Sequence, residues 1–357
     1  MKHRVGFIGF GGMGGGYHFQ VARDRQDAHP DYAPVAVYDV RESIRNVAVE
    51  NGLKAYDNLE EFLASDEFDI VVVATPNNFH CEMTCKALEA GKHVICEKPV
   101  AMSIDEFDLM VATAKKCGKY FFVHQNRRFD CDFLIAKHAY ETGRLGNMKR
   151  IEATFTGGYM DGWRTLASHG GGILYDWGVH LIDQIIFLMK DDKAVSVYAN
   201  LDCIKLTDCD DYAEVYINFE SGATARVVVC GETLVPMYRW NLRGDLGQLW
   251  IEEGYNKSGT LRAGDKKVVE HGTIDAYDEN GCYKTEKTIT VLDGLKRVEY
   301  PDDGFEVKQD WVELYKSMFD TIENGAPMLV EYDQVRTVLR IIDAARESSA
   351  TKTVIKL

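Results

Sequence analysis

Short apolar runs recur through the first 125 residues of this 357-residue chain. Each run is four or five residues long, rich in valine and isoleucine, and almost continuous in hydrophobicity. Strands that are buried on both faces of a parallel sheet have this appearance. We therefore predict strands at Arg4–Ile8, Val35–Tyr38, Ile70–Ala74, His93–Cys96 and Tyr120–Val123.

Stretches with helical periodicity separate these runs, and each carries a signal for its end. A glycine follows both Ser43–Asn51 and Phe79–Ala90, where it suits a left-handed helix cap. Ser103 and Glu106 form a capping box at the start of a third stretch, and Gly118 ends that stretch. Strands that alternate with helices in this way predict a doubly wound α/β domain.

The pattern changes after about Gln125. A helix is predicted over Asp132–Thr142, and strands of alternating polarity dominate from Met148 onward. Helical periodicity returns near Val307–Asn324 and Val335–Ser348. The second part of the chain therefore reads as an α/β domain built around an open, mostly antiparallel sheet.

One hairpin shows the alternation in this second part most clearly. Apolar residues occupy every second position of the run Tyr212–Phe219, and the turn Glu220-Ser221-Gly222 leads into Ala223–Cys230. The other face of the hairpin is mixed and carries Tyr212 and Tyr216. That face meets either a second subunit or solvent, and the pattern alone leaves both open.

Composition narrows the class of protein. Lysine and arginine number 41 against 56 acidic residues, a net charge of −15, which disfavours binding to nucleic acid or to anionic membranes. No apolar run approaches the ~20 residues that cross a membrane, and the apolar start Val5–Phe10 is too short for a signal peptide. Nine cysteines without a C-x-x-C pair favour reduced thiols in the cytoplasm. No cluster of ligands suggests a metal site.

A glycine motif follows the first predicted strand. Gly9-Phe10-Gly11-Gly12-Met13-Gly14 has the form G-x-G-x-x-G and leads into a helix within a βαβ unit. Gly9 can make the tight turn, Gly11 lets the backbone approach a pyrophosphate, and Gly14 lets helix and strand pack closely. The helix N-terminus then offers amides to the phosphates of a dinucleotide.

Two further positions bear on this dinucleotide. Asp39 ends the second strand, where an acid accepts hydrogen bonds from the adenosine ribose. A carboxylate there repels a 2′-phosphate, so NAD is favoured over NADP, although Arg41 could accommodate that phosphate. Thr75-Pro76-Asn77-Asn78 follows the third strand at the carboxyl edge that borders the ligand crevice, where it either lines the cofactor or forms a plain polar loop.

Candidate chemical residues lie in two segments. Glu97-Lys98-Pro99 follows the strand His93–Cys96, so Lys98 is placed at the crevice. Asp176 and His180 are four residues apart on one predicted helix, so we expect them to share a face and meet. His180 can take a proton from a hydroxyl, and the carboxylate is expected to raise its basicity. A surface lysine and a helix-surface ion pair are the alternatives.

Together these motifs resemble the Gfo/Idh/MocA oxidoreductases, over nearly the whole chain and in the same order. The resemblance implies an NAD(P)-binding Rossmann domain at residues 1–125 and a substrate-binding and oligomerisation domain at 126–357. It also implies dimers or tetramers through the C-terminal sheet. Lys98, Asp176 and His180 match the family's catalytic trio. Further cofactor contacts are implied for Gly12, Met13, Thr75, Pro76, Asn77, His80, Glu97 and Asn126, and substrate contacts for Arg127, Tyr159, Trp163 and Arg164.

The expected reaction is oxidation of a secondary ring hydroxyl of a sugar, glycoside or cyclitol, such as an inositol, to a ketone. His180 would act as general base while hydride passes to C4 of the nicotinamide, and Lys98 would stabilise the developing alkoxide. Two other classes remain open: reduction of an imine, dihydrodiol or tetrapyrrole precursor, and a non-catalytic NAD(H)-binding sensor.

Overall fold

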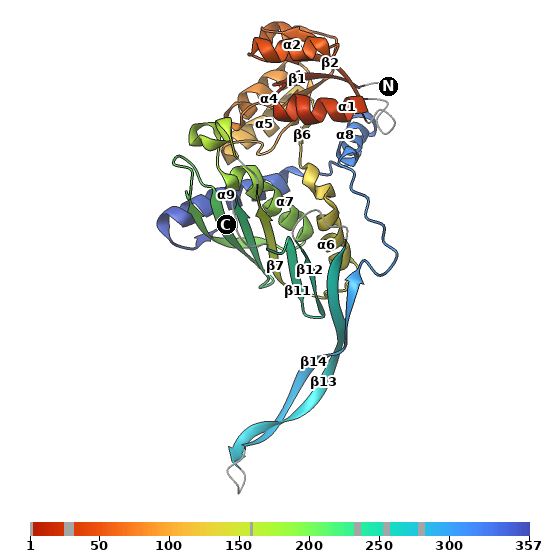
Figure 1. Cartoon of the computed structure of the whole chain (residues 1–357), viewed down its shortest axis with the longest axis vertical. Coiled ribbons are helices and arrows are strands. Elements are labelled where there is room, and N and C mark those ends of the chain that lie inside the picture. Colours follow the sequence, from red (N-terminus) through yellow and green to blue (C-terminus); the bar gives the residue numbers. More distant parts are fainter. Residues whose placement is uncertain (1–2, 25–31, 158–159, 232–236, 253–257, 278–282) are drawn as a thin grey trace.

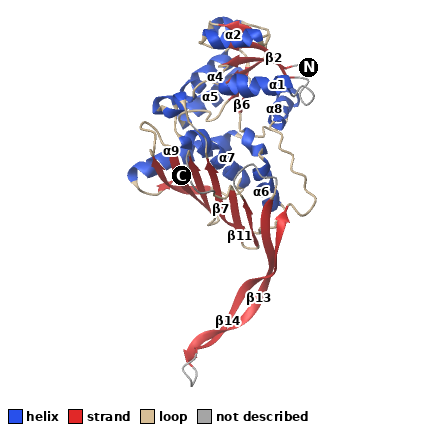
Figure 2. Cartoon of the chain, viewed as in Figure 1, coloured by secondary structure: helices blue, strands red, loops and turns tan. Residues whose placement is uncertain are grey.

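A computed structural model describes residues 3–24, 32–157, 160–231, 237–252, 258–277 and 283–357 of the chain. These residues form two separate sheets, which Figures 1 and 2 show as ribbons. The doubly wound domain and the open, mostly antiparallel sheet predicted from the sequence are both confirmed.

The first sheet is parallel and has six strands in the order β3-β2-β1-β4-β5-β6. Its strands are short, and the central ones are buried along nearly their whole length, as the unbroken apolar runs require. The bounds are β1 (His3–Ile8), β2 (Tyr32–Tyr38), β3 (Lys54–Tyr56), β4 (Ile70–Val73), β5 (His93–Cys96) and β6 (Phe121–Val123). Strand β3 was not predicted from the sequence.

The described residues of this first part contain five α-helices. Ser103 accepts a hydrogen bond from the Glu106 amide at one helix start, and Gly118 closes that helix at φ +63°, as expected from the capping signals. The helices are α1 (Phe19–Asp24), α2 (Glu42–Glu50), α3 (Leu59–Ala64), α4 (His80–Glu89) and α5 (Ile104–Cys117). Helix α3 was not predicted.

The second sheet has nine strands in the order β14-β13-β12-β11-β7-β10-β9-β8-β15. Among the described strands of this sheet, β7 and β10 pair in parallel and the other neighbours pair antiparallel. The strands are β7 (Met148–Thr156), β8 (Ala194–Asp202), β9 (Tyr212–Phe219), β10 (Thr224–Cys230), β11 (Trp240–Gly244), β12 (Gly247–Ile251), β13 (Gly259–Tyr277), β14 (Tyr283–Tyr300) and β15 (Ile355–Lys356).

Three helices cover one face of this sheet and build its core: α6 (Cys131–Glu141), α7 (Val179–Leu188) and α9 (Tyr332–Thr351). Strand β9 alternates as the sequence predicts, with Ala213, Val215, Ile217 and Phe219 buried towards the helices. The residues between them are half-buried on the open face. No helix in the described part of the chain is long and apolar enough to cross a membrane.

A long hairpin leaves the second sheet. Strand β12 pairs with β13 only as far as Ala263, whereas the pairing of β13 with β14 continues to Tyr277 and Tyr283. Figure 1 shows this two-stranded arm extending well away from both sheets. The sequence reading predicted strands in this part of the chain but not an arm.

Helix α8 (Val312–Asn324) returns the chain to the first sheet. Leu314, Tyr315 and Met318 are buried in the hydrophobic core of the N-terminal half. The helix begins five residues later than the predicted start at Val307, because the Asp310 carboxylate accepts the Val312 amide and starts the helix there. The C-terminal region therefore contributes to the core behind the glycine motif.

Candidate active site

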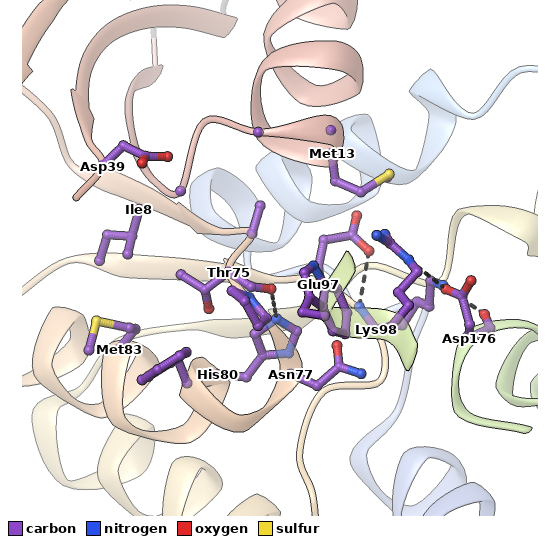
Figure 3. Close-up of a pocket in the computed structure, with 18 of the residues that line it drawn as sticks. Ile8, Met13, Asp39, Thr75, Asn77, His80, Met83, Glu97, Lys98 and Asp176 are labelled. Carbon is purple, nitrogen blue, oxygen red and sulfur yellow. Dashed lines mark hydrogen bonds and ion pairs between the residues drawn. The ribbon is translucent and has the colours of Figure 1, made fainter. Parts of the chain in front are cut away.

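A cavity of about 680 Å³ lies at the carboxyl ends of the first sheet's strands and continues against the second domain. Figure 3 shows Asp39 and Met83 at one end and Lys98 and Asp176 at the other. The lining includes these predicted residues: Gly9, Gly11, Gly12, Met13, Asp39, Arg41, Thr75, Pro76, Asn77, His80, Glu97, Lys98, Asn126, Arg127, Trp163, Arg164, Asp176 and His180. Tyr159 lies outside the described residues.

The glycine motif forms a tight turn between β1 and a π-helical turn at Gly14–His18. Gly9 has φ +86°, and a Cβ there would lie 2.7 Å from the Ala74 carbonyl oxygen. A Cβ on Gly14 would lie 2.1 Å from the Gly9 oxygen, so Gly14 serves close packing and does not line the cavity. A Cβ on Gly12 would meet nothing within 4 Å, which leaves this turn open to a ligand's phosphates.

Gly14→Ala should lower the free energy of unfolding by about 1–3 kcal/mol, because the methyl group forces backbone atoms apart. It should also weaken dinucleotide binding, since the turn that is predicted to hold the phosphates moves. Gly16→Ala is the matched control, because a Cβ there meets nothing within 4 Å. Thermal unfolding and calorimetric titration of NAD would measure both effects, and equal behaviour of the two variants would contradict this reading.

Asp39 is held firmly at the end of β2. Its Oδ2 accepts the Phe10 amide at 3.0 Å, and the Arg41 guanidinium donates to both carboxylate oxygens. Burial alone would raise the pKa of Asp39, but the hydrogen bonds from Arg41 and Phe10 outweigh it and lower the pKa. The Asp39 carboxylate is therefore a fixed, ionised hydrogen-bond acceptor at this end of the cavity.

His80 connects two loops at the carboxyl edge of the first sheet. Its ring nitrogens lie 3.0 Å from the Thr75 carbonyl oxygen and 2.8 Å from that of Pro99. Asn77 donates to the Gly170 carbonyl at 2.8 Å, which joins this edge to the second domain. The turn that follows β4 thus lines the cavity and also fixes its shape.

Lys98 reaches across to the second domain. Its Nζ donates to the main-chain oxygen of Asp176 at 2.7 Å and to Oδ1 of the same residue at 3.1 Å. Arg164 Nε lies 3.5 Å from that Oδ1. Burial would raise the pKa of Asp176, but the charges of Lys98 and Arg164 lower it overall, so the carboxylate is ionised.

The expected contact between Asp176 and His180 is not formed: no hydrogen bond joins these side chains in the described structure. The reason is a π-helical turn at Leu174–Gly178, which changes the phase of the helix before α7. The expected rise in basicity is also wrong. Burial, followed by the charges of Lys98 and Arg127, lowers the pKa of His180 well below its usual value.

His180 is nevertheless suited to accept a proton. It is 4% exposed and lines the cavity, and its Nδ1 has no hydrogen-bond partner in the described structure. A lowered pKa keeps the imidazole neutral near neutral pH, so a lone pair is available for a hydroxyl proton. Lys98 follows the first sheet's β5 and His180 lies on α7 of the second domain; both line the cavity, and after burial the charge of Lys98 is the next cause of the lowered pKa of His180.

Sequence reasoning missed several residues at this end. The Trp177 ring stacks on Phe155 with centroids 3.7 Å apart, and the Arg127 guanidinium lies 4.4 Å from its centroid. Arg127 in turn donates to the buried Asp130 at 3.1 Å. Trp177 directly follows the predicted Asp176 in sequence, but only the fold brings Phe155 to Trp177 and Asp130 to Arg127.

The cavity fits a nicotinamide dinucleotide. The glycine turn is open beside Gly12, Asp39 offers a fixed acceptor for a ribose hydroxyl, and Lys98 and His180 lie at the opposite end. Chemically, a neutral base, an ammonium group and an electron carrier at one place can exchange a proton and a hydride with an alcohol.

Comparison with known families agrees with this geometry. The family described as "Oxidoreductase family, NAD-binding Rossmann fold" matches residues 3–125. The "GFO/IDH/MocA C-terminal domain" matches residues 133–250. The two matched segments together span more than half of the chain.

Individual relatives align over most of their length. Oxidoreductase C26H5.09c of Schizosaccharomyces pombe is 35% identical over 318 residues, 85% of each chain. The scyllo-inositol 2-dehydrogenase (NADP(+)) IolW of Bacillus subtilis is 28% identical over 306 residues, 84% of this chain and 82% of the relative. The crystal structure of an NAD-binding protein from Listeria innocua superposes with a TM-score of 0.83 at 34% identity, over 100% of this chain and 97% of that one.

Proposed function

Because the chain belongs to the Gfo/Idh/MocA oxidoreductase family, we propose that it oxidises a secondary hydroxyl of a sugar, glycoside or cyclitol with a nicotinamide cofactor. One observation carries the proposal. Lys98 from the first domain and His180 from the second domain line one cavity that also contains the glycine turn. The similarity to a scyllo-inositol dehydrogenase supports a polyol as substrate class.

In the proposed reaction His180, Lys98 and Asp176 have different roles. Neutral His180 accepts the hydroxyl proton as the carbon is oxidised. The Lys98 ammonium stabilises negative charge on the same oxygen, an effect usually worth about 3–4 kcal/mol. Asp176 holds Lys98 in place through its carbonyl and carboxylate oxygens. The nicotinamide, when bound, supplies the two-electron acceptor.

The residues around this end suit a polyhydroxylated ring. Trp163 and Arg164 form a short turn over the cavity, with the guanidinium 4.6 Å from the indole centroid. Arg127 and Asp176 add a donor and an acceptor. Such a mixture of flat apolar surface and polar groups recognises a sugar ring by its faces and its hydroxyls.

A substrate panel tests the proposed reaction. The purified protein would be incubated with NAD or NADP and with inositols, free aldoses and glycosides, and formation of reduced nicotinamide would be followed by absorbance. We expect oxidation of at least one compound, and no oxidation of matching deoxy compounds that lack the reacting hydroxyl. Binding of reduced nicotinamide without turnover of any polyol would favour a sensor and contradict the proposal.

We also propose that NAD is preferred over NADP. The support is Asp39, whose ionised carboxylate is fixed where a 2′-phosphate would be repelled. Wild-type protein should show the higher kcat/KM with NAD, and Asp39→Ser should shift selectivity towards NADP, because Arg41 then loses its acidic partner and can meet the phosphate. Wild-type selectivity for NADP would contradict this assignment.

We further propose a homo-oligomer. Tyr198 and Tyr216 pack together on the open face of the second sheet, beside an ion pair of Arg226 with Glu214 at 2.6 Å. The arm formed by β13 and β14 extends beyond this sheet, and a two-stranded ribbon is marginally stable alone in water. We assign both surfaces to a second copy of the chain. Native mass spectrometry should show a dimer or tetramer; a monomer at micromolar concentration would contradict this.

A cytoplasmic location is proposed on the state of the thiols. Six of the described cysteines are free thiols: Cys81, Cys85, Cys96, Cys117, Cys203 and Cys209. Free thiols of this number are typical of a reducing compartment. Quantification of thiols in protein isolated without reductant should find them reduced.

A further inference from the structure

A loop of the second domain contacts two segments that line the active site. The loop comprises residues 203–211 and joins β8 to β9. All of its residues are described, and none of them lines the cavity. It bonds instead to the turns at residues 162–172 and to the start of the π-helical turn Leu174–Gly178, both of which contribute side chains to the cavity wall.

The first contact fixes the turns at residues 162–172. Asp208 Oδ2 accepts the Ala167 amide at 2.7 Å. The next residue, Cys209, donates from its Sγ to the main-chain oxygen of Arg164 at 3.6 Å. Arg164 lines the cavity, so its backbone is held by residues that lie outside the cavity.

The second contact fixes the start of the helix that follows. Asp210 accepts the Ile173 amide on its main-chain oxygen and the Leu174 amide on Oδ2, both at 2.8 Å. Amides at the start of a helix have no partner within the helix, so Asp210 supplies the acceptors. Gly172 permits this approach, because its φ is +112° and a Cβ there would lie 2.3 Å from Asp210 Oδ1.

This helix start carries the candidate chemical groups of the second domain. Asp176 lies in the π-helical turn Leu174–Gly178 and accepts a hydrogen bond from Lys98, and His180 follows on α7. A helix moves as a unit, so the place of the carboxylate and of the imidazole depends on where its first turn is held. Misplacement of a reacting group by about 1 Å can cost 10²-fold in rate.

Hydrogen bonds within the loop give it a fixed shape. Asp211 is 8% exposed, and its carboxylate accepts the amides of Ile204, Lys205 and Leu206 at 2.6, 2.6 and 2.8 Å. Its own amide donates to the main-chain oxygen of Asp202, at the end of β8, at 3.1 Å. The loop therefore holds the two segments from the end of a strand of the second sheet.

We propose that residues 203–211 position the active site for the proposed reaction. Asp208 fixes the backbone of Arg164 on the substrate side, and Asp210 fixes the helix that carries His180. The inference rests on the proposed function in one respect: it takes this cavity as the place where the polyol is oxidised. Asp208 and Asp210 are positioning residues, since both act through residues that line the cavity.

The two aspartates should have different kinetic effects. With saturating cofactor and a polyol that the wild type oxidises, Asp208→Ala should raise KM for the polyol about threefold at unchanged kcat, because one solvent-exposed hydrogen bond is lost. Asp210→Ala should lower kcat by about 10–10²-fold, because the helix start shifts. Steady-state kinetics measures both. Equal changes of kcat and KM in the two variants would overturn the proposal.

Asp210→Asn separates hydrogen-bond geometry from charge. Asparagine keeps the shape and an oxygen that can accept the Leu174 amide, so this variant should retain kcat close to that of the wild type. A loss as large as that of Asp210→Ala would show that the charge matters instead, and would overturn the proposal.

Asp192→Ala is the matched control. Asp192 Oδ1 accepts the Ser221 amide at 3.1 Å, in a turn that does not line the cavity. This variant should keep the wild-type kcat and KM. If Asp210→Ala lost activity only in proportion to its unfolded fraction, its role would be purely structural and the proposal would fail. If Asp210→Ala does not fold, the exposed Asp208 decides: an unchanged KM for Asp208→Ala overturns the proposal.

Hydrogen exchange measured by mass spectrometry, without substrate, separates this proposal from the proposed function. Asp210→Ala should speed exchange in peptides that cover residues 173–180, whereas Asp192→Ala should leave those peptides unchanged. If the wild type oxidises no polyol, the proposed function fails, and exchange alone decides whether the loop positions this helix. Unchanged exchange in Asp210→Ala would then overturn the positioning role.

Discussion

Replacement of His180 by asparagine should lower kcat for polyol oxidation by about 10²–10⁴-fold. His180 is the residue proposed to accept the hydroxyl proton. It is 4% exposed and lines the cavity, and its buried Nδ1 has no hydrogen-bond partner in the described structure. Asparagine is smaller and polar but cannot take up a proton. Calorimetric titration should show the affinity for NAD little changed, since the proposed dinucleotide contacts, apart from Asn126, lie in residues 1–125.

His138→Asn is the matched control for this substitution. His138 is a partly exposed histidine of α6 whose Nε2 lies 2.8 Å from Asp303, and it does not line the cavity. The control should retain wild-type kcat. If His180→Asn retained most of its turnover, another group would be the base and the proposed mechanism would fail.

The second large effect concerns Lys98. Lys98→Met should lower kcat by about 10²–10³-fold, because the ammonium that stabilises the developing alkoxide is lost. It should also move the pH profile. The charge of Lys98 helps to lower the pKa of His180, so its removal raises that pKa. His180 must be neutral to act, and activity falls as pH drops through its pKa; the acid limb of kcat should therefore shift to higher pH.

Lys86→Met provides the control, since Lys86 lies on the surface of α4 and pairs only with Glu82 at 2.6 Å. Its pH profile should match that of the wild type. An acid limb of Lys98→Met that stayed in place, or moved to lower pH, would show that Lys98 and His180 are not electrostatically coupled.

The cofactor half of the site could be predicted from the sequence because its signals are local. The glycine motif, the acid at the end of β2 and the turn after β4 each follow a buried apolar strand. Parallel strands bring their carboxyl ends to one edge, so position in the sequence implies position in space. The same logic placed Lys98 correctly, and the structure shows Lys98 in the cavity with these elements.

The contacts across the two domains could not be predicted in this way. The helical spacing of Asp176 and His180 suggested a direct contact, but the π-helical turn at Leu174–Gly178 directs the carboxylate to Lys98. The buried side-chain partners of Glu97 are His18 and His124, and His18 in turn bonds to Tyr315; nothing in their local sequence marks these residues as neighbours. Long-range packing decides such contacts.

Two missed elements have different causes. Asn58 accepts the Glu61 amide at 3.0 Å at the start of α3, so a usable capping signal was present in the sequence. The arm formed by β13 and β14 has no comparable signal. Beyond Ala263 its strands pair only with each other, so the alternation that marks a strand packed on a core is not imposed there.

The central claim is that Lys98 and His180 meet on one substrate oxygen beside the nicotinamide. The most direct measurement is a crystal structure of the protein with NAD and the best polyol from the panel. The account predicts the reacting hydroxyl oxygen within about 2.6–3.2 Å of both Lys98 Nζ and a ring nitrogen of His180. A hydroxyl held by other groups, with either of these side chains turned out of the cavity, would contradict it.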